Sequence, residues 1–214
     1  MDNNGSQGAR IRAVFFDLGK VILSFSHDDI VGRLLSATPP ADRRPDELFR
    51  FLFDSRDGLC NLYDEGAVSS EEFFGRIDGR FGLGVGFGEF ADLWNGIFTE
   101  DAAVTEIVRA VRADRPAYLL SNVNELHWEY IQGRYGVLSE LDGLALSYRM
   151  ETKKPKPEIF EAALEMAGVK GHEAVFIDDL EENTRAAAEF GITGITFTGH
   201  DDLARTLRGM GLLR

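Results

Sequence analysis

Four polar clusters carry side chains that can do chemistry, and most of them directly follow an apolar run. The aspartates at 178 and 179 follow the run 174–177. Two adjacent carboxylates repel each other unless a positive charge lies beside them, so this pair predicts a hard cation held by oxygen ligands. The four clusters are Asp17, Ser121 with Asn122, Lys154, and Asp178 with Asp179.

Each cluster alone has an ordinary explanation. An aspartate after a strand is commonly a turn or helix-cap residue, and a Ser-Asn pair after a strand is a common N-cap. Lys154 lies in the basic run 153–156, which is typical of a solvated patch. The case for a shared site therefore depends on the four clusters taken together.

Together the clusters predict a phosphoryl-transfer site. In this interpretation Asp17 attacks phosphorus in line and forms an aspartyl phosphate, which water then hydrolyses. Mg²⁺ held by Asp17 and by the aspartates at 178 and 179 brings the nucleophile and the phosphate together. Lys154 supplies a fixed positive charge, and the Ser121 hydroxyl with the amides after it completes a phosphate cradle at a helix N-terminus.

The elements that must position these clusters alternate between strand and helix. Short apolar runs at 13–18, 117–120, 174–177 and 192–197 are typical of strands buried on both faces. Apolar residues at helical spacing predict helices between them, for example over 159–167. The alternation predicts an α/β fold with a parallel sheet covered by helices. Such sheets bind ligands outside the carboxyl ends of their strands, where the clusters fall.

The segment between the first strand and residue 101 has a different character. Its phenylalanines are set among charges and no buried-strand run appears, so we expect an inserted helical segment. Ser69 and Glu72 have the spacing of a capping box, which predicts a helix over about 70–80. The glycines of 81–88 alternate with other residues and never form G-x-G-x-x-G, which argues against a dinucleotide site and for a connection between helices.

Composition excludes several classes of protein. The apolar fraction of 44% and the charged fraction of 28% are those of an ordinary globular protein. A net charge of −13 repels nucleic acid and anionic membranes, yet allows a small phosphorylated substrate beside a bound cation. The single cysteine, Cys60, cannot form an internal disulfide, and residues 1–10 lack an apolar signal segment. We therefore expect a cytoplasmic protein whose residues 1–10 are disordered.

The ordered segments 16–23, 120–122, 154–160 and 176–179, together with Asn183, resemble the motifs of the haloacid dehalogenase superfamily. The resemblance spans residues 13 to about 197 and looks closest to the α-D-glucose-1-phosphatase-like group. It implies a Rossmann-like, three-layer core over residues 1–23 and 99–214. It also implies that residues 24–98, inserted after the first motif, form a helical cap.

The resemblance also implies a role for each motif residue. Asp17, Lys154 and Ser121 are expected to be catalytic, and Lys154 to stabilise charge. Contacts with phosphate and substrate are expected from Ser121, Asn122 and Lys154. The expected Mg²⁺ ligands are Asp17, the backbone carbonyl of Gly19, Asp178 and Asp179, with Asp179 favoured over Asp178 for direct coordination.

One position departs from the family pattern. Most phosphatases of the superfamily carry a second aspartate two residues after the nucleophile, where this chain has Gly19. General acid–base catalysis is worth about 10²–10⁴-fold, so we expect slow turnover or a preference for good leaving groups such as an anomeric sugar phosphate. His27 is a weaker candidate for the missing proton donor, and Lys20 either contacts phosphate or faces solvent.

These residues leave three functions open. The first is a Mg²⁺-dependent phosphomonoester hydrolase acting on a small phosphorylated metabolite such as a sugar phosphate. The alternatives are a catalytically weak or inactive binding domain and a metal-independent 2-haloacid dehalogenase, against which the Asp178–Asp179 pair argues. The oligomeric state is open, and so is the set of cap residues that reach the site, with the candidates Arg33, Arg43, Arg44, Phe51, Phe53, Arg56 and Trp94.

Overall fold

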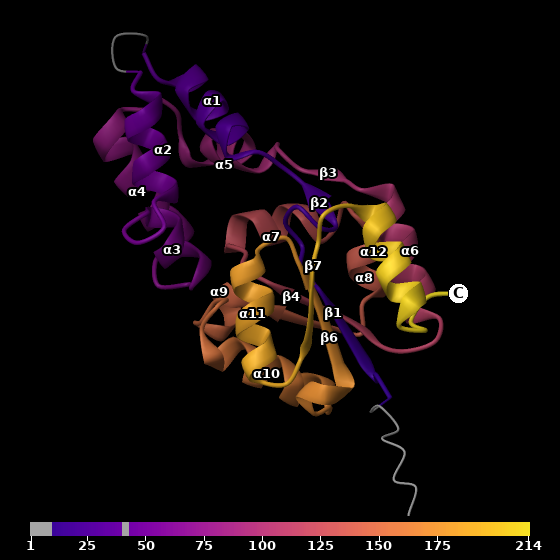
Figure 1. Cartoon of the computed structure of the whole chain (residues 1–214). Coiled ribbons are helices and arrows are strands. Elements are labelled where there is room, and N and C mark those ends of the chain that lie inside the picture. The colour runs from indigo at the N-terminus through magenta and orange to yellow at the C-terminus, as the bar shows by residue number, and fades with distance from the viewer. Residues whose placement is uncertain (1–9, 40–42) are drawn as a thin grey trace, which may run out of the picture.

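A five-stranded, wholly parallel sheet forms the centre of the protein, whose computed structural model describes residues 10–39 and 43–214. The strand order is β5-β4-β1-β6-β7, so the first strand of the chain lies in the middle (Figure 1). The predicted α/β fold is confirmed. The strands are β1 (Ala13–Phe16), β4 (Ala117–Ser121), β5 (Gly143–Leu146), β6 (Ala174–Asp178) and β7 (Thr193–Thr196).

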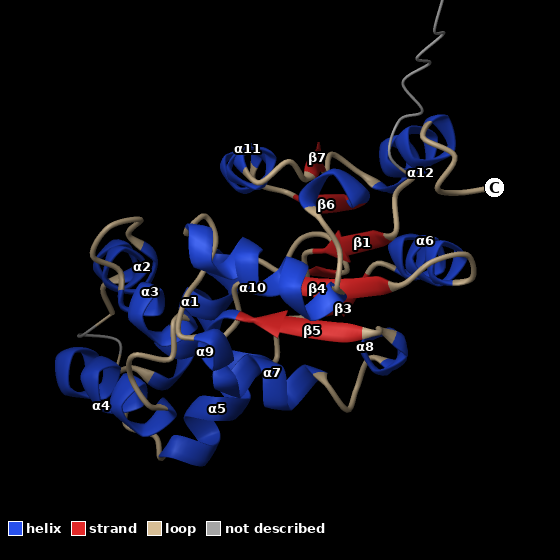
Figure 2. Ribbon diagram, turned by 90° about the horizontal axis from the view of Figure 1, so that it is seen from below, coloured by secondary structure: helices blue, strands red, loops and turns tan. Residues whose placement is uncertain are grey.

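Helices cover both faces of this sheet (Figure 2). Successive side chains of a strand point to opposite faces, so Val14 and Phe16 pack on one helical layer while Ala13 and Phe15 pack on the other. The first layer contains α6 (Ala102–Arg112), α7 (Glu125–Ile131), α8 (Gly136–Glu140) and α12 (His200–Gly209). The second contains α10 (Pro157–Ala167) and α11 (Glu181–Glu189), while α9 (Ser147–Met150) and the 3₁₀ turn η2 (Gly171–Glu173) are short connections.

Five helices lie between Ser24 and Thr99 in the described part of the chain. An antiparallel pair of two-residue strands, β2 (Leu23–Ser24) and β3 (Thr99–Glu100), forms the base of this excursion. Figure 1 shows the helices grouped on the side toward which β1 leads. They are α1 (His27–Ala37), α2 (Pro45–Phe53), α3 (Leu59–Asp64), α4 (Ser70–Phe81) and α5 (Phe87–Asn95).

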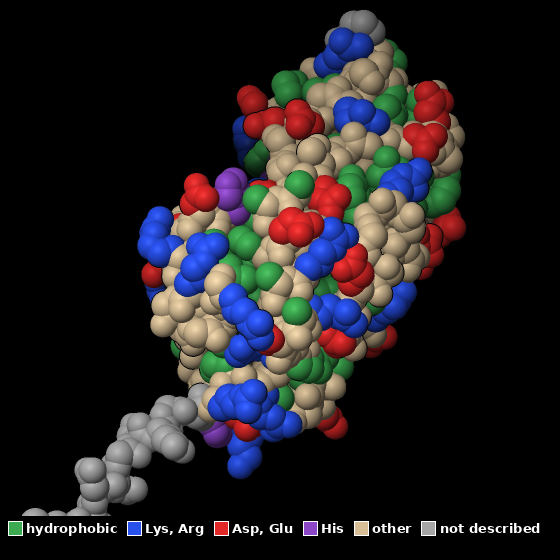
Figure 3. All heavy atoms as spheres, turned by 90° about the vertical axis from the view of Figure 1, so that its right-hand side faces the viewer, with side chains coloured by type: hydrophobic (Ala, Val, Ile, Leu, Met, Phe, Trp, Pro, Cys, Tyr) green, Lys and Arg blue, Asp and Glu red, His purple; other side chains and the backbone are tan. Residues whose placement is uncertain are grey.

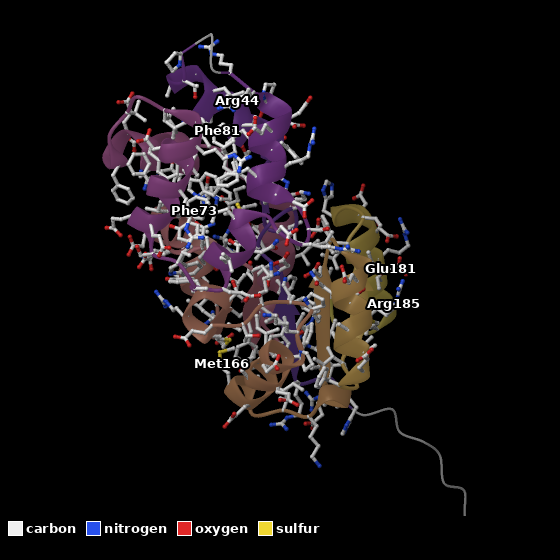
Figure 4. The ribbon with its side chains drawn as sticks, turned by 90° about the vertical axis from the view of Figure 1, so that its left-hand side faces the viewer. Arg44, Phe73, Phe81, Met166, Glu181 and Arg185 are labelled. Atoms are coloured by element: carbon white, nitrogen blue, oxygen red, sulfur yellow. The ribbon has the colours of Figure 1, made fainter. Side chains whose placement is uncertain are left out.

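These five helices bury a hydrophobic cluster of their own. Phe73, Phe81, Phe90 and Trp94 are at most 1% exposed, and Figure 4 shows Phe73 and Phe81 within this group of helices. The assignment of residues 24–98 to a cap and of 1–23 and 99–214 to a core stays a prediction. Of the segment 1–10 predicted to be disordered, residues 1–9 lie outside the described part of the chain.

Helix α4 shows how local sequence sets these boundaries. The Ser69 hydroxyl accepts a hydrogen bond from the amide of Glu72 at 3.1 Å, and the helix ends at Gly82, whose φ of 60° suits glycine. The predicted helix over about 70–80 is confirmed. The second half of the capping box is replaced, because the Glu72 carboxylate pairs with Arg76.

Charges of both signs share the outer surface. On the face that carries α6 and α12, Lys and Arg side chains lie among Asp and Glu side chains (Figure 3). Arg205 pairs with Asp202 and Arg109 pairs with Glu140 on these helices and their neighbours. Figure 4 shows Glu181 and Arg185, which pair at 2.7 Å, along α11. Within residues 10–39 and 43–214, no helix has the length and apolar character needed to cross a membrane.

Candidate active site

The sheet register brings the predicted catalytic segments to one edge. Phe16 of β1 is aligned with Leu119 of β4 and with Ile177 of β6. The residues that follow these positions, Asp17 and Asp178 among them, therefore leave the sheet side by side. The backbone amide of Asp17 also donates to the carbonyl of Ile177 at 2.8 Å, which fixes the nucleophile candidate at the end of its strand.

Lys154 joins two of these segments through one buried ammonium group. Its Nζ lies 2.8 Å from Asp17 Oδ1 and 2.6 Å from Asp178 Oδ2, and it donates to the carbonyl of Leu120 at 2.9 Å. The Lys154 side chain is only 1% exposed. Burial alone would lower the pKa of Lys154, but the carboxylates of Asp17 and Asp178 raise it above its ordinary value. The group is therefore a fixed positive charge beside Asp17.

The loop that carries Lys154 is held to the loop after β4. The side-chain oxygen of Asn122 accepts from the Lys154 amide at 2.8 Å, and its side-chain nitrogen donates to the Lys154 carbonyl at 2.9 Å. Asn122 also lines the cleft above Asp17. Ser121 differs, because it is fully buried and its hydroxyl donates to the Asn122 carbonyl at 3.4 Å. Its predicted contact with phosphate stays a prediction.

Asp178 is oriented from several sides. Its Oδ1 accepts from the amide of Leu180 at 2.8 Å, and the Asn183 side chain donates to both of its oxygens at 3.0 and 3.1 Å. With Lys154 on Oδ2, the carboxylate has little freedom to reorient. Asp179, next to it in sequence, instead lines the cleft directly.

Three carboxylates meet at this point and suit a cation. Asp17, Asp178 and Asp179 each offer an oxygen, and these oxygens all lie within 4.8 Å of one another. Burial raises the pKa of Asp17 to about 7, although Lys154 acts in the opposite direction, and burial also raises the pKa of Asp179. Three carboxylates against one buried ammonium leave two negative charges, which one divalent cation would balance. Hard cations prefer such oxygen ligands.

Gly19 lies beside Asp17 where the family pattern has an acid–base aspartate. A Cβ atom built on Gly19 would lie 2.8 Å from Cε1 of Phe25, so the ring of Phe25 fills the space that a side chain would need. The next residue, Lys20, has a φ of 58°, a left-handed conformation that is uncommon for a side chain of this kind. Its Nζ lies 5.8 Å from the centroid of the Phe25 ring.

The cleft above Asp17 has a volume of about 340 Å³. Lys154, Asp179, Asn122 and Gly19 line it from the sheet side, while Phe53 and Asp64 line it from the helices of 24–98. Among the candidate cap residues, Phe53 reaches this cleft and Trp94 a smaller cavity next to it. Neither cavity is lined by Arg33, Arg43, Arg44, Phe51 or Arg56.

The smaller cavity, which we call the inner compartment, has a volume of about 100 Å³. It adjoins the cleft, since Gly19, Phe25 and Asn122 line both. Sequence reasoning missed Asp64, Asn124 and His127 among its polar lining residues, and only their tertiary packing identifies them. The residues that line the compartment include Phe25, Phe53, Trp94, Phe98, Asp64 and His127.

Two comparisons with known sequences agree with this geometry. A model of the haloacid dehalogenase-like hydrolase family matches residues 11–191 of the chain. The chain is also 28% identical over 189 residues to D-ribitol-5-phosphate phosphatase of Bacteroides thetaiotaomicron. That alignment covers 85% of this chain and 89% of the relative.

Solved structures show the same architecture. A variant of a HAD family enzyme from Bacteroides thetaiotaomicron, in complex with magnesium and inorganic phosphate, superposes with a TM-score of 0.82 at 26% identity, covering 92% of this chain and 99% of that one. An L-2-haloacid dehalogenase from Xanthobacter autotrophicus gives a TM-score of 0.62 at 18% identity, covering 95% of this chain and 85% of that one. At this identity the match shows a shared fold and nothing more. These matches do not single out the α-D-glucose-1-phosphatase-like group, which stays a prediction.

Proposed function

The chain belongs to the haloacid dehalogenase-like hydrolase family, and from this premise we propose that it hydrolyses the phosphomonoester of a small metabolite, with Asp17 as nucleophile and Mg²⁺ as cofactor. The observation that carries the proposal is the contact of 2.8 Å between Asp17 and a buried lysine, beside two further carboxylates at the floor of a cleft. The similarity to a D-ribitol-5-phosphate phosphatase and to a HAD family enzyme in complex with magnesium and inorganic phosphate also supports it. A sugar or polyol phosphate is the substrate we favour.

The proposed reaction proceeds in two steps. An oxygen of Asp17 forms a bond to phosphorus as the ester P–O bond breaks, and the alkoxide leaving group takes a proton from the medium. Water then attacks phosphorus, so the aspartyl P–O bond breaks, free phosphate leaves and the Asp17 carboxylate is restored. Lys154 offsets the negative charge that collects near Asp17 in both steps, and it is already in place before substrate binds.

Mg²⁺ would be held by Asp17, Asp178 and Asp179, whose oxygens lie close enough together to share one ion, and by the carbonyl of Gly19. When bound, the ion would screen the repulsion between the Asp17 carboxylate and the incoming phosphate. Asp178 is fixed by Asn183 and Leu180, whereas Asp179 lines the cleft. This difference supports Asp179 as the more direct ligand.

A panel of phosphorylated metabolites tests the proposal. Purified protein should release phosphate from at least one small ester in the presence of Mg²⁺, and the rate should fall to background in excess chelator and return when Mg²⁺ is restored. A total lack of Mg²⁺-dependent release, with no stabilisation by beryllofluoride and Mg²⁺ in a thermal shift, would favour the inactive alternative. Halide release from a 2-haloacid in excess chelator would instead favour the dehalogenase.

Gly19 leads to a separate prediction about rate. Glycine cannot carry a proton, so the leaving group departs without help from this position, and esters of poor leaving groups should be slow. Gly19→Asp alone should gain little, since its side chain meets the Phe25 ring. Gly19→Asp with Phe25→Leu should raise kcat for an alkyl phosphate by about 10²-fold, while Phe25→Leu alone should not.

The comparison of leaving groups provides the control. An aryl phosphate with a good leaving group needs no proton, so the double variant should gain much less on p-nitrophenyl phosphate than on the alkyl ester. Equal gains on both esters, or none on either, would contradict this account of position 19. The comparison requires that the starting protein hydrolyses p-nitrophenyl phosphate in the presence of Mg²⁺.

A further inference from the structure

The inner compartment lies beside Gly19, two residues after Asp17. Gly19 lines both the compartment and the cleft, and so do Phe53 and Asp64 from the opposite side. Whatever is esterified to a phosphate on Asp17 must extend away from the buried lysine, and this compartment lies next to that position. Its volume of about 100 Å³ suits a few non-hydrogen atoms, since an apolar cavity of about 150 Å³ admits benzene.

The aromatic rings of the compartment pack against one another and against neighbouring histidines. Trp94 stacks on His127 with centroids 5.0 Å apart and planes 4° apart, and Phe53 stacks on His27 at 4.2 Å. Phe98 meets His127 edge-on at 4.8 Å. Together these rings form an apolar wall against which an organic group can pack.

His127 contributes a hydrogen-bond acceptor to this apolar wall. The residue is 8% exposed, and burial lowers its pKa to about 3, so the ring is neutral at physiological pH. Its Nδ1 lies 3.0 Å from the side-chain oxygen of Asn95, and this contact requires the proton on Nδ1. The lone pair of Nε2 therefore has no partner among the described residues.

Asp64 contributes a second acceptor from the helical segment. Asn124 donates to its Oδ1 at 3.1 Å, and no hydrogen bond to Oδ2 occurs within the described part of the chain. Asn124 is itself held in place, because its oxygen accepts from the His127 amide at 3.1 Å and from the indole of Trp94 at 3.4 Å. The carboxylate is thereby held in place with one oxygen free, in a cavity it shares with His127.

We propose that the inner compartment binds the hydroxylated end of the substrate's alcohol, with His127 Nε2 and Asp64 accepting hydrogen bonds from its hydroxyl groups. The inference rests on the proposed function and assigns the selection of its favoured substrates, small phosphorylated polyhydroxy compounds, to two residues. Asp64 and His127 are then specificity-determining residues rather than catalytic ones. A second anionic group on the substrate would be repelled by the Asp64 carboxylate.

Two esters of equal chain length test the proposal, D-ribitol 5-phosphate and n-pentyl phosphate. The wild-type protein should prefer the ribitol ester by at least about tenfold in kcat/KM, because the two acceptors otherwise stay unpaired. His127→Phe keeps the stack on Trp94 but removes both ring nitrogens. It should lower kcat/KM for the ribitol ester by about tenfold, mainly through KM, and change the value for the pentyl ester less than threefold.

Two further variants separate binding from folding. His172→Phe makes the same replacement at an exposed position on η2, and it should alter neither ester. Asp64→Asn keeps an acceptor for Asn124 but loses the charged acceptor, so it should show the same selective loss for the ribitol ester if His127→Phe proves unstable. Selective loss in either variant supports the proposal.

Other results would overturn the inference, and they can be told apart from a failure of the proposed function. Equal kcat/KM for the two esters in the wild type, or equal losses on both in the variants, would overturn the inference and leave the proposed function standing. Hydrolysis of other phosphate esters but neither of these two would overturn it as well. Failure of the wild-type protein on every ester tested would overturn the proposed function itself.

Discussion

Asp17→Asn is expected to lower kcat by at least about 10⁴-fold, because an amide cannot replace the carboxylate that attacks phosphorus. The fold should survive the change, since the new side chain has the same shape and Lys154 keeps Asp178 as a partner at 2.6 Å. The measurement is the steady-state rate of Mg²⁺-dependent phosphate release, with the melting temperature recorded in parallel.

Asp202→Asn is a matched control for this variant. Asp202 lies on the exposed surface of α12, where its carboxylate pairs with Arg205. The same replacement there should leave kcat unchanged within a factor of two. If Asp17→Asn retained a tenth or more of the activity, the nucleophile would have to be another group, and the mechanism proposed above would be wrong.

Lys154→Met should damage both stability and activity. The buried ammonium is the partner of two carboxylates, and removing one side of a buried ion pair costs about 3–5 kcal/mol of unfolding free energy. Loss of its charge beside the transferring phosphoryl group should also lower kcat by about 10²–10³-fold. Urea unfolding in chelator and phosphate release in Mg²⁺ measure the two effects.

Lys156→Met, two residues from Lys154, is the matched control for Lys154→Met. Lys156 pairs with Glu65 at 2.8 Å, but its side chain is 51% exposed, so its removal should cost less than about 1 kcal/mol and leave kcat unchanged. Added Mg²⁺ should recover part of the stability lost in Lys154→Met, since it supplies positive charge to the same carboxylates. Equal destabilisation by the two variants would show that the buried lysine has no special electrostatic role.

The fold was predictable where strands are buried on both faces. The runs that became β1, β4 and β6 are continuously apolar because helices cover both sides of the sheet, and this pattern is strong even in four residues. The strand β5 was not predicted. It has only four residues, begins with Gly143, and is half-buried at its start, so its sequence lacks the continuous apolar run of a fully buried strand.

The site was predictable to the extent that it depends on strand ends. Asp17, Asp178 and Asp179 come together because β1 lies beside β6, whereas the sequence predicts only that each follows the carboxyl end of a strand. Lys154 was predicted from its motif alone. Its burial between Asp17 and Asp178 could not be inferred from the sequence, because a run of lysines and a proline is typical of an exposed loop.

The contacts between the helical segment and the core could not be predicted. Phe25 fills the space above Gly19, and Asp64 reaches Asn124 across sixty residues of sequence. Neither contact leaves a periodic pattern in the sequence, since each depends on how the chain packs in three dimensions. In the proposal above, such packing decides which group can enter the inner compartment and therefore which substrate is preferred.

The central claim is that phosphate is transferred to Asp17, and chemical trapping tests it most directly. The lack of an acid–base side chain at Gly19 should slow the attack of water, so the aspartyl phosphate should accumulate during turnover of p-nitrophenyl phosphate with Mg²⁺. Borohydride reduction of the quenched enzyme converts an aspartyl phosphate to homoserine. The account predicts homoserine at position 17 in the peptide mass spectrum, absent without substrate; turnover with unmodified Asp17, or with homoserine at another aspartate, would contradict it.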